Sequence, residues 1–281
     1  MTALRIEDLR IVASGLDHPE GVAVDTDGTI WCGGEAGQLY RVDPGTGTVE
    51  QVADTGGFSL GVACDATGRV YVCVASERPA VLRFDPATGV VETYCDSADG
   101  GPLVLPNWAA FAPDGTLWCT DSGTESLGAL DGRILMIPPG GGDAAVANAD
   151  PLHFPNGLCL DADGAVCFVD TLTPGLFRLE DGQAATVTDL PGHSPDGILA
   201  CADGSFIVAC YYPFRLLLVP VGGGAFEVLL DDATGIHLPM PTNAAYLADG
   251  GTEIVIGSLG GQALTAIDVG MRGLPLNRPS V

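Results

Sequence analysis

The sequence predicts an all-β fold: a six-bladed β-propeller with four-stranded antiparallel blades, in which the N-terminal strand closes the ring. A turn marked by Asp-Gly or a similar pair recurs six times along the chain, and an apolar, β-rich run lies on either side of each turn. No stretch of useful length shows the 3.6-residue period of an amphipathic helix. A repeat of roughly 40 to 50 residues without helices is typical of propeller blades.

The repeat is defined by the glycine of each turn and by the position eight residues before it. The turn glycines are Gly28, Gly68, Gly115, Gly164, Gly204 and Gly250. The six positions reached by stepping back, called the ring positions from here on, are Glu20, Leu60, Asn107, Asn156, Asp196 and Thr242. An apolar run follows each ring position, and a second β-rich run follows the turn, so every unit begins with two strands joined by a tight turn.

Each unit continues with two further strands. The segments QLYRVDPGTGTVEQVAD and AVLRFDPATGVVETYCD each read as a strand, a Pro-x-Thr-Gly turn and a second strand. The last unit supplies only three strands, near Ala244–Leu247, Glu253–Ser258 and Leu264–Asp268, whereas Leu9–Ala13 is a β-like run without a turn partner. We expect this N-terminal strand to complete the last blade, because closure hides two exposed sheet edges. One domain is expected over residues 1–281.

Composition excludes several classes of partner. With 36 acidic and 11 basic residues the formal charge is -25, which argues against nucleic acid and anionic membranes as partners. No window reaches the roughly 18 apolar residues of a membrane span, and we expect a cytoplasmic protein. The nine cysteines form no C-x-x-C pair, so they are interpreted as small, reduced core residues.

The ring positions predict a metal centre. The first strand of each propeller blade lines the central axis, so residues that start these strands should face one another. Oxygen donors occupy Glu20, Asn107, Asn156 and Asp196, and converging carboxylates in an apolar channel are costly to bury without a cation. Although a single Pro-Asn-Gly is most often only a turn, the repeat places these residues together. Oxygen donors favour Ca²⁺, with Mg²⁺, Mn²⁺ or Zn²⁺ as alternatives.

The series Pro-Glu20-Gly, Pro-Asn107, Pro-Asn156-Gly and Pro-Asp196-Gly resembles the senescence marker protein (regucalcin)/gluconolactonase/LRE-like family of six-bladed propellers. Its order is also similar to that of squid-type diisopropylfluorophosphatase, and the resemblance covers essentially the whole chain. It implies a divalent metal held by Glu20, Asn156 and Asp196, with Asn107 as a further ligand or a substrate contact. It also implies a metal-dependent hydrolase that opens a lactone or related ester, with the metal as Lewis acid and Asp196 as general base.

One departure from the family pattern concerns the substrate. Sugar lactonases of this family typically carry an arginine two residues before the asparagine matched by Asn107 and an Asp-Gly after it, whereas this chain has Leu105 and Trp108-Ala109. A lactone or ester less polar than a sugar lactone is therefore expected as the small-molecule partner. The candidate substrate-binding residues are Asn107, Trp108, Asp121 and His193.

Further polar residues lie near the ring positions. Asp121 and Asp170 each follow a ring asparagine by fourteen residues; they could orient that asparagine or shuttle protons, but capping of a turn is favoured. His193 is an alternative general base, and Glu125 is a candidate on the loop after Asp121. All four histidines lie two to five residues before a ring position: His18, His153, His193 and His237.

Two other functions remain open from the sequence. The chain could be a propeller that binds calcium or a small molecule without turnover, since fold alone does not give activity. It could also be a phosphotriesterase or a strictosidine-synthase-like enzyme. Lactone hydrolysis measured with and without a chelator distinguishes the hydrolase from a protein that only binds.

Overall fold

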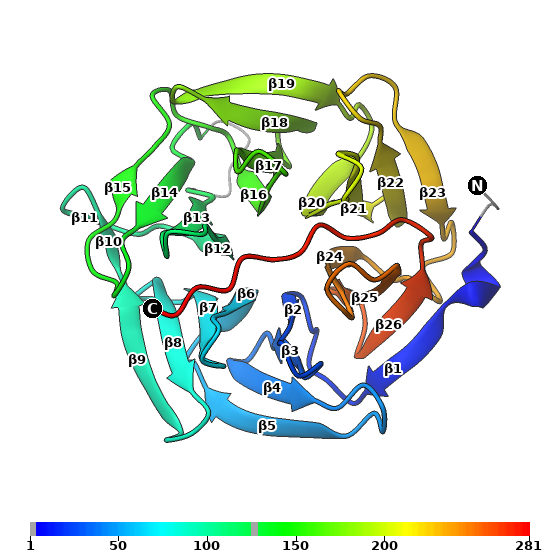
Figure 1. Ribbon diagram of the computed structural model, residues 1–281, viewed down its shortest axis with the longest axis horizontal. Coiled ribbons are helices and arrows are strands. Elements are labelled where there is room, and N and C mark those ends of the chain that lie inside the picture. Colours follow the sequence, from blue (N-terminus) through cyan, green and yellow to red (C-terminus); the bar gives the residue numbers. More distant parts are fainter. Residues whose placement is uncertain (1–3, 125–128) are drawn as a thin grey trace.

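The computed structural model describes residues 4–124 and 129–281, and within them six four-stranded antiparallel sheets surround a central axis (Figure 1). Each sheet is one blade. In five of them the strands follow one another in chain order from the axis to the rim, and in the sixth the N-terminal strand is the outermost. The predicted six-bladed propeller is therefore confirmed. The expectations of a single domain over residues 1–281 and of a cytoplasmic location remain predictions.

The first three blades are formed by consecutive strands. Blade 1 contains β2 (Val22–Val24), β3 (Ile30–Gly33), β4 (Gln38–Val42) and β5 (Val49–Asp54). Blade 2 contains β6 (Phe58–Cys64), β7 (Val70–Ala75), β8 (Ala80–Asp85) and β9 (Val90–Cys95). Blade 3 contains β12 (Pro106–Phe111), β13 (Leu117–Asp121), β14 (Arg133–Ile137) and β15 (Ala145–Val146).

The next two blades repeat this order, and the last combines both ends of the chain. Blade 4 contains β16 (Pro155–Leu160), β17 (Val166–Asp170), β18 (Gly175–Glu180) and β19 (Gln183–Asp189). Blade 5 contains β20 (Ser194–Ala200), β21 (Phe206–Tyr212), β22 (Arg215–Val219) and β23 (Glu227–Asp231). Blade 6 contains β24 (Pro241–Tyr246), β25 (Glu253–Ser258), β26 (Ala263–Asp268) and the N-terminal β1 (Arg10–Ser14).

The N-terminal strand closes the ring as predicted. β1 pairs antiparallel with β26 as the outermost strand of blade 6, with Arg10 opposite Ala266 and Ser14 opposite Ala263. Pairing the two ends of the chain in one sheet removes the free edges that an open ring would expose.

Local turn chemistry explains the hairpins at the end of each inner strand. In blade 1 the Asp25 amide donates to the Thr29 carbonyl, and Gly28 has φ of 88°, a conformation that a glycine adopts without steric cost. The side chain of Asp27 accepts a hydrogen bond from the Thr29 amide at 2.9 Å. Such turns bring two β-rich runs into an antiparallel pair.

Two small elements lie outside the blades. A hairpin of β10 (Ser97–Ala98) and β11 (Gly101–Pro102) connects blades 2 and 3, and it was not expected from the sequence. The 3-10 helix η1 (Ile6–Asp8) precedes β1. No helix in the two described ranges is both long enough and apolar enough to cross a membrane.

The apolar core lies between neighbouring blades. Trp108 and Ile134 of blade 3, for example, pack with Leu158 and Phe168 of blade 4 in one buried cluster. All nine cysteines are buried and carry free thiols, as expected for small core residues. The blades are therefore held together by side chains from their faces, and their inner strands are left to line the axis.

The chain ends on a segment without regular strands that lies across one end of the central channel. Figure 1 shows this segment, residues 272–281, as the red trace that crosses the centre of the ring. Leu274 donates its amide to the Ala200 carbonyl at 3.0 Å, and the Pro279 carbonyl accepts from Ala66 at 3.0 Å. Because Ala200 and Ala66 lie where inner strands end, the segment covers the channel end opposite the ring positions.

Candidate metal centre

The ring positions lie at the starts of the inner strands and are buried. Asn107, Asn156 and Asp196 belong to β12, β16 and β20, and Glu20 comes two residues before β2. Their side chains are shielded from solvent, with exposed fractions of 8% for Glu20 and 4% for Asp196. Two carboxylates and two amides are thus enclosed at one end of the channel, as the repeat predicts.

Close contacts between inner strands bring neighbouring ring positions together. A β-carbon on Gly157 would collide with the carbonyl oxygen of Asp196, and one on Gly197 would collide with that of Thr242. The Thr242 hydroxyl in turn donates to the carbonyl oxygen of Glu20 at 3.0 Å. Glycine after a ring position therefore permits the inner strand of the next blade to approach closely.

The buried carboxylates influence one another. Burial raises the pKa of Asp196 well above its ordinary value, and the negative charge of Glu20 raises it further. Two carboxylates in one low-dielectric site disfavour ionisation of both, unless a cation compensates their charge. Glu20 and Asp196 therefore lie within electrostatic reach across the channel although blade 6 separates their blades.

Asn156 presents an oxygen without a partner. Its Nδ2 donates to the Thr171 hydroxyl at 3.2 Å, and that hydroxyl donates to the Pro195 carbonyl at 2.7 Å. Because the hydroxyl proton is already used, the hydroxyl can only accept from Asn156, which fixes the amide orientation. The Oδ1 atom of Asn156 is buried and has no hydrogen-bond partner among the described residues. A buried acceptor of this kind calls for a ligand, an ion or a water molecule.

These donors fit a hard divalent cation. Carboxylate and amide oxygens are the ligands that Ca²⁺ and Mg²⁺ prefer, and neither a thiolate nor an imidazole occupies a ring position. Glu20, Asn107, Asn156 and Asp196 remain the predicted metal ligands, with Asp196 the predicted general base.

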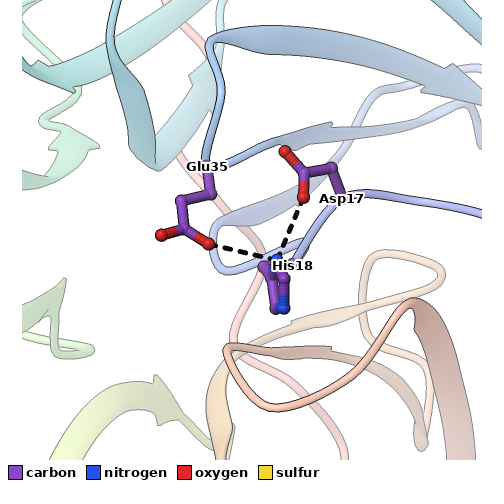
Figure 2. A group of neighbouring side chains, drawn as sticks. All are labelled: Asp17, His18 and Glu35. Atoms are coloured by element: carbon purple, nitrogen blue, oxygen red, sulfur yellow. Dashed lines mark hydrogen bonds and ion pairs between the residues drawn. The ribbon is translucent and has the colours of Figure 1, made fainter.

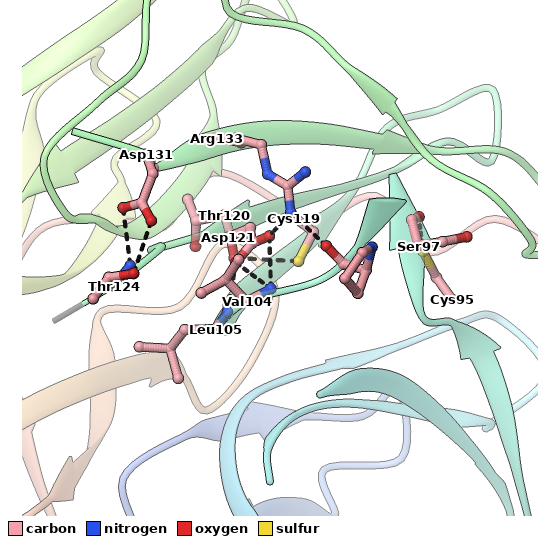
Figure 3. Close-up of polar contacts among 12 residues, drawn as sticks. Cys95, Ser97, Val104, Leu105, Cys119, Thr120, Asp121, Thr124, Asp131 and Arg133 are labelled. Carbon is pink, nitrogen blue, oxygen red and sulfur yellow. Dashed lines mark hydrogen bonds and ion pairs between the residues drawn. The ribbon is translucent and has the colours of Figure 1, made fainter. Parts of the chain in front are cut away.

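Asp121 and Asp170 support the loops that lead to the ring asparagines, and Figure 3 shows the contacts of Asp121. The Asp121 carboxylate accepts from the Leu105 amide at 2.6 Å and pairs with Arg133. Asp170 accepts from the Phe154 amide at 3.0 Å. Both carboxylates therefore cap the backbone two residues before a ring asparagine. Capping was the role favoured from the sequence.

The remaining predicted substrate contacts lie in different surroundings. Trp108 is buried and lines a cavity at the far end of the channel. His193 is 8% exposed; its Nδ1 lies 3.1 Å from the Pro191 carbonyl and its Nε2 3.2 Å from Arg215. Both ring nitrogens of His193 are engaged, and Asp121 is paired with Arg133. Substrate binding by Trp108, Asp121 and His193 stays a prediction. Glu125 lies outside the described residues.

A cluster that sequence analysis missed lies beside Glu20. Asp17, His18 and Glu35 form the one group of three such side chains, among the described His, Cys, Asp and Glu residues, whose ligand atoms lie within 4.8 Å of one another. Figure 2 shows His18 Nδ1 between the two carboxylates, 3.0 Å from Asp17 and 3.1 Å from Glu35. Both carboxylates therefore contact the same ring nitrogen, Nδ1. In the sequence only the adjacent Asp17 and His18 are visible as a pair. The fold places Glu35 beside them.

Comparison with known proteins gives a family and a fold. Residues 19–226 match the family described as the SMP-30/Gluconolactonase/LRE-like region. Protein strictosidine synthase-like 6 of Arabidopsis thaliana is 28% identical over 213 residues, which are 69% of this chain and 56% of that protein. Strictosidine synthase-like 3 of the same plant is 29% identical over 56% of this chain and 44% of its own length. The chain thus spans about half the length of these curated relatives.

Solved structures with the same architecture include two proteins with described properties. A gluconolactonase from Xanthomonas campestris superposes with a TM-score of 0.75 at 22% identity, covering 95% of this chain and 89% of its own. Regucalcin from Agrobacterium tumefaciens, described as a calcium-binding protein, has a TM-score of 0.78 at 18% identity and covers 96% of both chains. At these identities the likeness is one of fold.

Proposed function

Because the chain belongs to the SMP-30/Gluconolactonase/LRE-like family, we propose that it is a divalent-cation-dependent hydrolase that opens a lactone or related ester. The observation that carries the proposal is the buried Oδ1 of Asn156, which has no partner among the described residues and belongs to the same ring as the buried carboxylates of Glu20 and Asp196. This combination is chemically suited to a hard cation.

Calcium is the cation that the donor set supports best. It would be held by the side-chain oxygens of four residues: Glu20, Asn107, Asn156 and Asp196. When bound, such a cation supplies a Lewis acid that stabilises negative charge on a carbonyl oxygen.

Asp196 is suited to act as the general base. It would take a proton from the attacking water as the water oxygen bonds to the carbonyl carbon of the substrate. The ester C–O bond would then break, and the same proton would pass to the departing alkoxide, which yields the hydroxy acid. In the cation-free protein, burial and the charge of Glu20 raise the pKa of Asp196.

The apolar surroundings of Asn107 support a substrate less polar than a sugar lactone. Leu105 and Phe58 pack, partly buried, against the cluster that contains Leu60 and Leu103. Leu105 thus brings an aliphatic side chain where sugar lactonases of the family typically carry arginine. An aliphatic lactone would gain binding free energy from this surface, because apolar area removed from water stabilises the complex by about 25 cal/mol per Å².

A pH-stat assay tests the proposal. We expect faster hydrolysis of δ-valerolactone than of glucono-δ-lactone, loss of both activities with chelator and recovery with calcium. Asp196→Asn should lower kcat/KM by about 10² or more. Asp161→Asn is the matched control, because Asp161 accepts from Ala165 in a turn after β16 and should leave the rate unchanged. Ester hydrolysis that is unaffected by Asp196→Asn would contradict the role of Asp196 as general base, and calcium binding without any hydrolysis above the uncatalysed rate would contradict the hydrolase assignment.

A second candidate function is favoured by the curated relatives. Both are named strictosidine synthase-like, which supports a condensing enzyme on the same propeller. If no lactone, ester or phosphotriester is hydrolysed, the strictosidine synthase reaction is the next one to assay. If calcium binds and neither reaction occurs, a non-catalytic role in binding calcium or a small molecule follows.

A further inference from the structure

The central channel contains a cavity of about 110 Å³ at the end opposite the ring positions. All six inner strands contribute to its wall, and Leu274 and Leu276 of the C-terminal segment also line it. Ala110 and Leu199 lie on inner strands and line the cavity, yet both are only half-buried, because their side chains border the free space. The cavity is therefore a feature of the channel and not a dent in the outer surface.

The cavity wall is apolar. It is formed mainly by valine, alanine, leucine and isoleucine together with Trp108, and the polar side chains Asp249, Asn277 and Arg278 also line it. The Tyr246 hydroxyl is engaged by the Cys201 thiol at 3.4 Å. Some described side chains have a buried polar atom without a hydrogen-bond partner, but none of them lines this cavity. A water molecule against the aliphatic part of this wall lacks the two to four polar partners that it needs, whereas an apolar cavity of roughly 150 Å³ binds benzene or xenon.

The C-terminal segment, residues 272–281, is placed as a lid on this cavity. Arg278 fastens it: Nη1 lies 2.7 Å from the Asp249 carboxylate, and Nη2 donates to the Val24 carbonyl at 3.0 Å. The Arg278 side chain is only 9% exposed, and Asp249 and Arg278 both lie at the rim of the cavity. With the segment in place, this ion pair neutralises both charges at the rim, so a bound molecule meets no unpaired ionic group.

We propose that the cavity is a binding site for one small, uncharged apolar molecule, of about the size of benzene, and that residues 272–281 are the lid that opens to admit it. The site is separate from the ring positions and does not depend on the proposed hydrolase activity. Binding removes apolar surface of both wall and ligand from water, which is the driving force. Entry requires the contacts of Arg278 to break, so this residue controls the exchange rate.

The experiment is a ¹⁹F NMR titration of the full chain with fluorobenzene, with EDTA present so that the ring positions carry no cation. We expect one saturable site in the wild type. Ala110→Leu fills the cavity and should weaken affinity at least about tenfold, which corresponds to 1.4 kcal/mol. Arg278→Ala should speed exchange about tenfold. Arg272→Ala is the matched control on the same segment and should behave as the wild type, because the one hydrogen bond of its guanidinium to the described residues is to the Gly250 carbonyl.

Crystals of the wild-type protein under xenon pressure provide a test that requires no variant. Xenon bound among Trp108, Ala110 and Leu199 supports the proposal even if Ala110→Leu fails to fold. Absence of saturable fluorobenzene binding in the wild type, or xenon bound elsewhere and not in this cavity, overturns it. Equal exchange rates in Arg278→Ala and Arg272→Ala would refute the role of the lid.

Discussion

Burial raises the pKa of Asp196, and the negative charge of Glu20 raises it further, although Glu20 and Asp196 belong to blades 1 and 5 of the propeller. The two residues are distant in the sequence and belong to different sheets. They interact because every inner strand begins at the same end of the channel, where a charge on one blade shifts the pKa of a group on another. Four predictions follow from this arrangement and from the contacts that support it.

Stability should depend on pH through Asp196. Its pKa is raised in the folded state, so the folded chain keeps a proton that the unfolded chain releases above about pH 4. This contribution is fully present below the unfolded pKa and is lost as the pH rises through the folded pKa. In cation-free protein we expect the melting temperature to fall more with rising pH in the wild type than in Asp196→Asn.

Differential scanning fluorimetry of both proteins in EDTA, from pH 4 to pH 9, measures this difference. Calcium added at the upper end of the range should restore stability to the wild type only. Parallel curves for the two proteins would show that Asp196 does not titrate with a raised pKa.

Removal of the Asn156 amide should weaken calcium binding selectively. Its Oδ1 has no partner among the described residues, so Asn156→Ala breaks only the 3.2 Å hydrogen bond to Thr171. We expect calcium affinity to fall at least about tenfold, with a loss of about 1 kcal/mol in the cation-free stability. Isothermal titration calorimetry measures the affinity.

Asn148→Ala is the matched control for Asn156→Ala. Asn148 accepts from the Ile134 amide at 2.6 Å in blade 3 and lies outside the ring positions. This variant should lose stability without losing calcium affinity. An equal loss of affinity in both variants would mean that Asn156 acts only through the general stability of the fold.

The Asp121–Arg133 pair should be important for stability. Asp121 is fully buried, so Arg133→Ala leaves its charge without a counterion inside blade 3. Breaking a buried pair in this way costs about 3–5 kcal/mol, less where the remaining carboxylate keeps its hydrogen bonds, here from the Val104 and Leu105 amides. Urea unfolding gives the free energy directly.

An exposed ion pair provides the comparison for Arg133→Ala. Arg41 and Glu50 lie 2.6 Å apart with both side chains about half exposed, and Arg41→Ala should cost no more than about 1 kcal/mol. Similar losses in the two arginine variants would indicate that Asp121 is hydrated and needs no counterion.

The close approach of blades 5 and 6 should not tolerate a β-carbon at Gly197. Gly197→Ala would place a methyl group against the Thr242 carbonyl, and overpacking of this kind costs about 1–3 kcal/mol. Displacement of Asp196 beside it should also weaken calcium binding. Gly101→Ala is the control, because a β-carbon there meets only the Ala98 carbonyl at 3.7 Å. A Gly197→Ala protein as stable as Gly101→Ala would refute the steric argument.

The sequence by itself determined the blades, the closure by the N-terminal strand and the six ring positions. Apolar β-rich runs and turn residues such as Asp27 and Gly28 act over a few neighbouring residues, and a repeat carries that local information to every blade. The resemblance to the SMP-30/Gluconolactonase/LRE-like family, which rests on the ring positions, is borne out by the family match over residues 19–226.

Only the tertiary structure decided which side chains have partners. It pairs Asp121 with Arg133, adds Glu35 to Asp17 and His18, and engages both nitrogens of His193. It also lays residues 272–281 over the far end of the channel. These contacts join segments that are distant in the chain or on different strands, and their geometry depends on the twist and spacing of packed sheets. No local pattern in the sequence encodes that geometry.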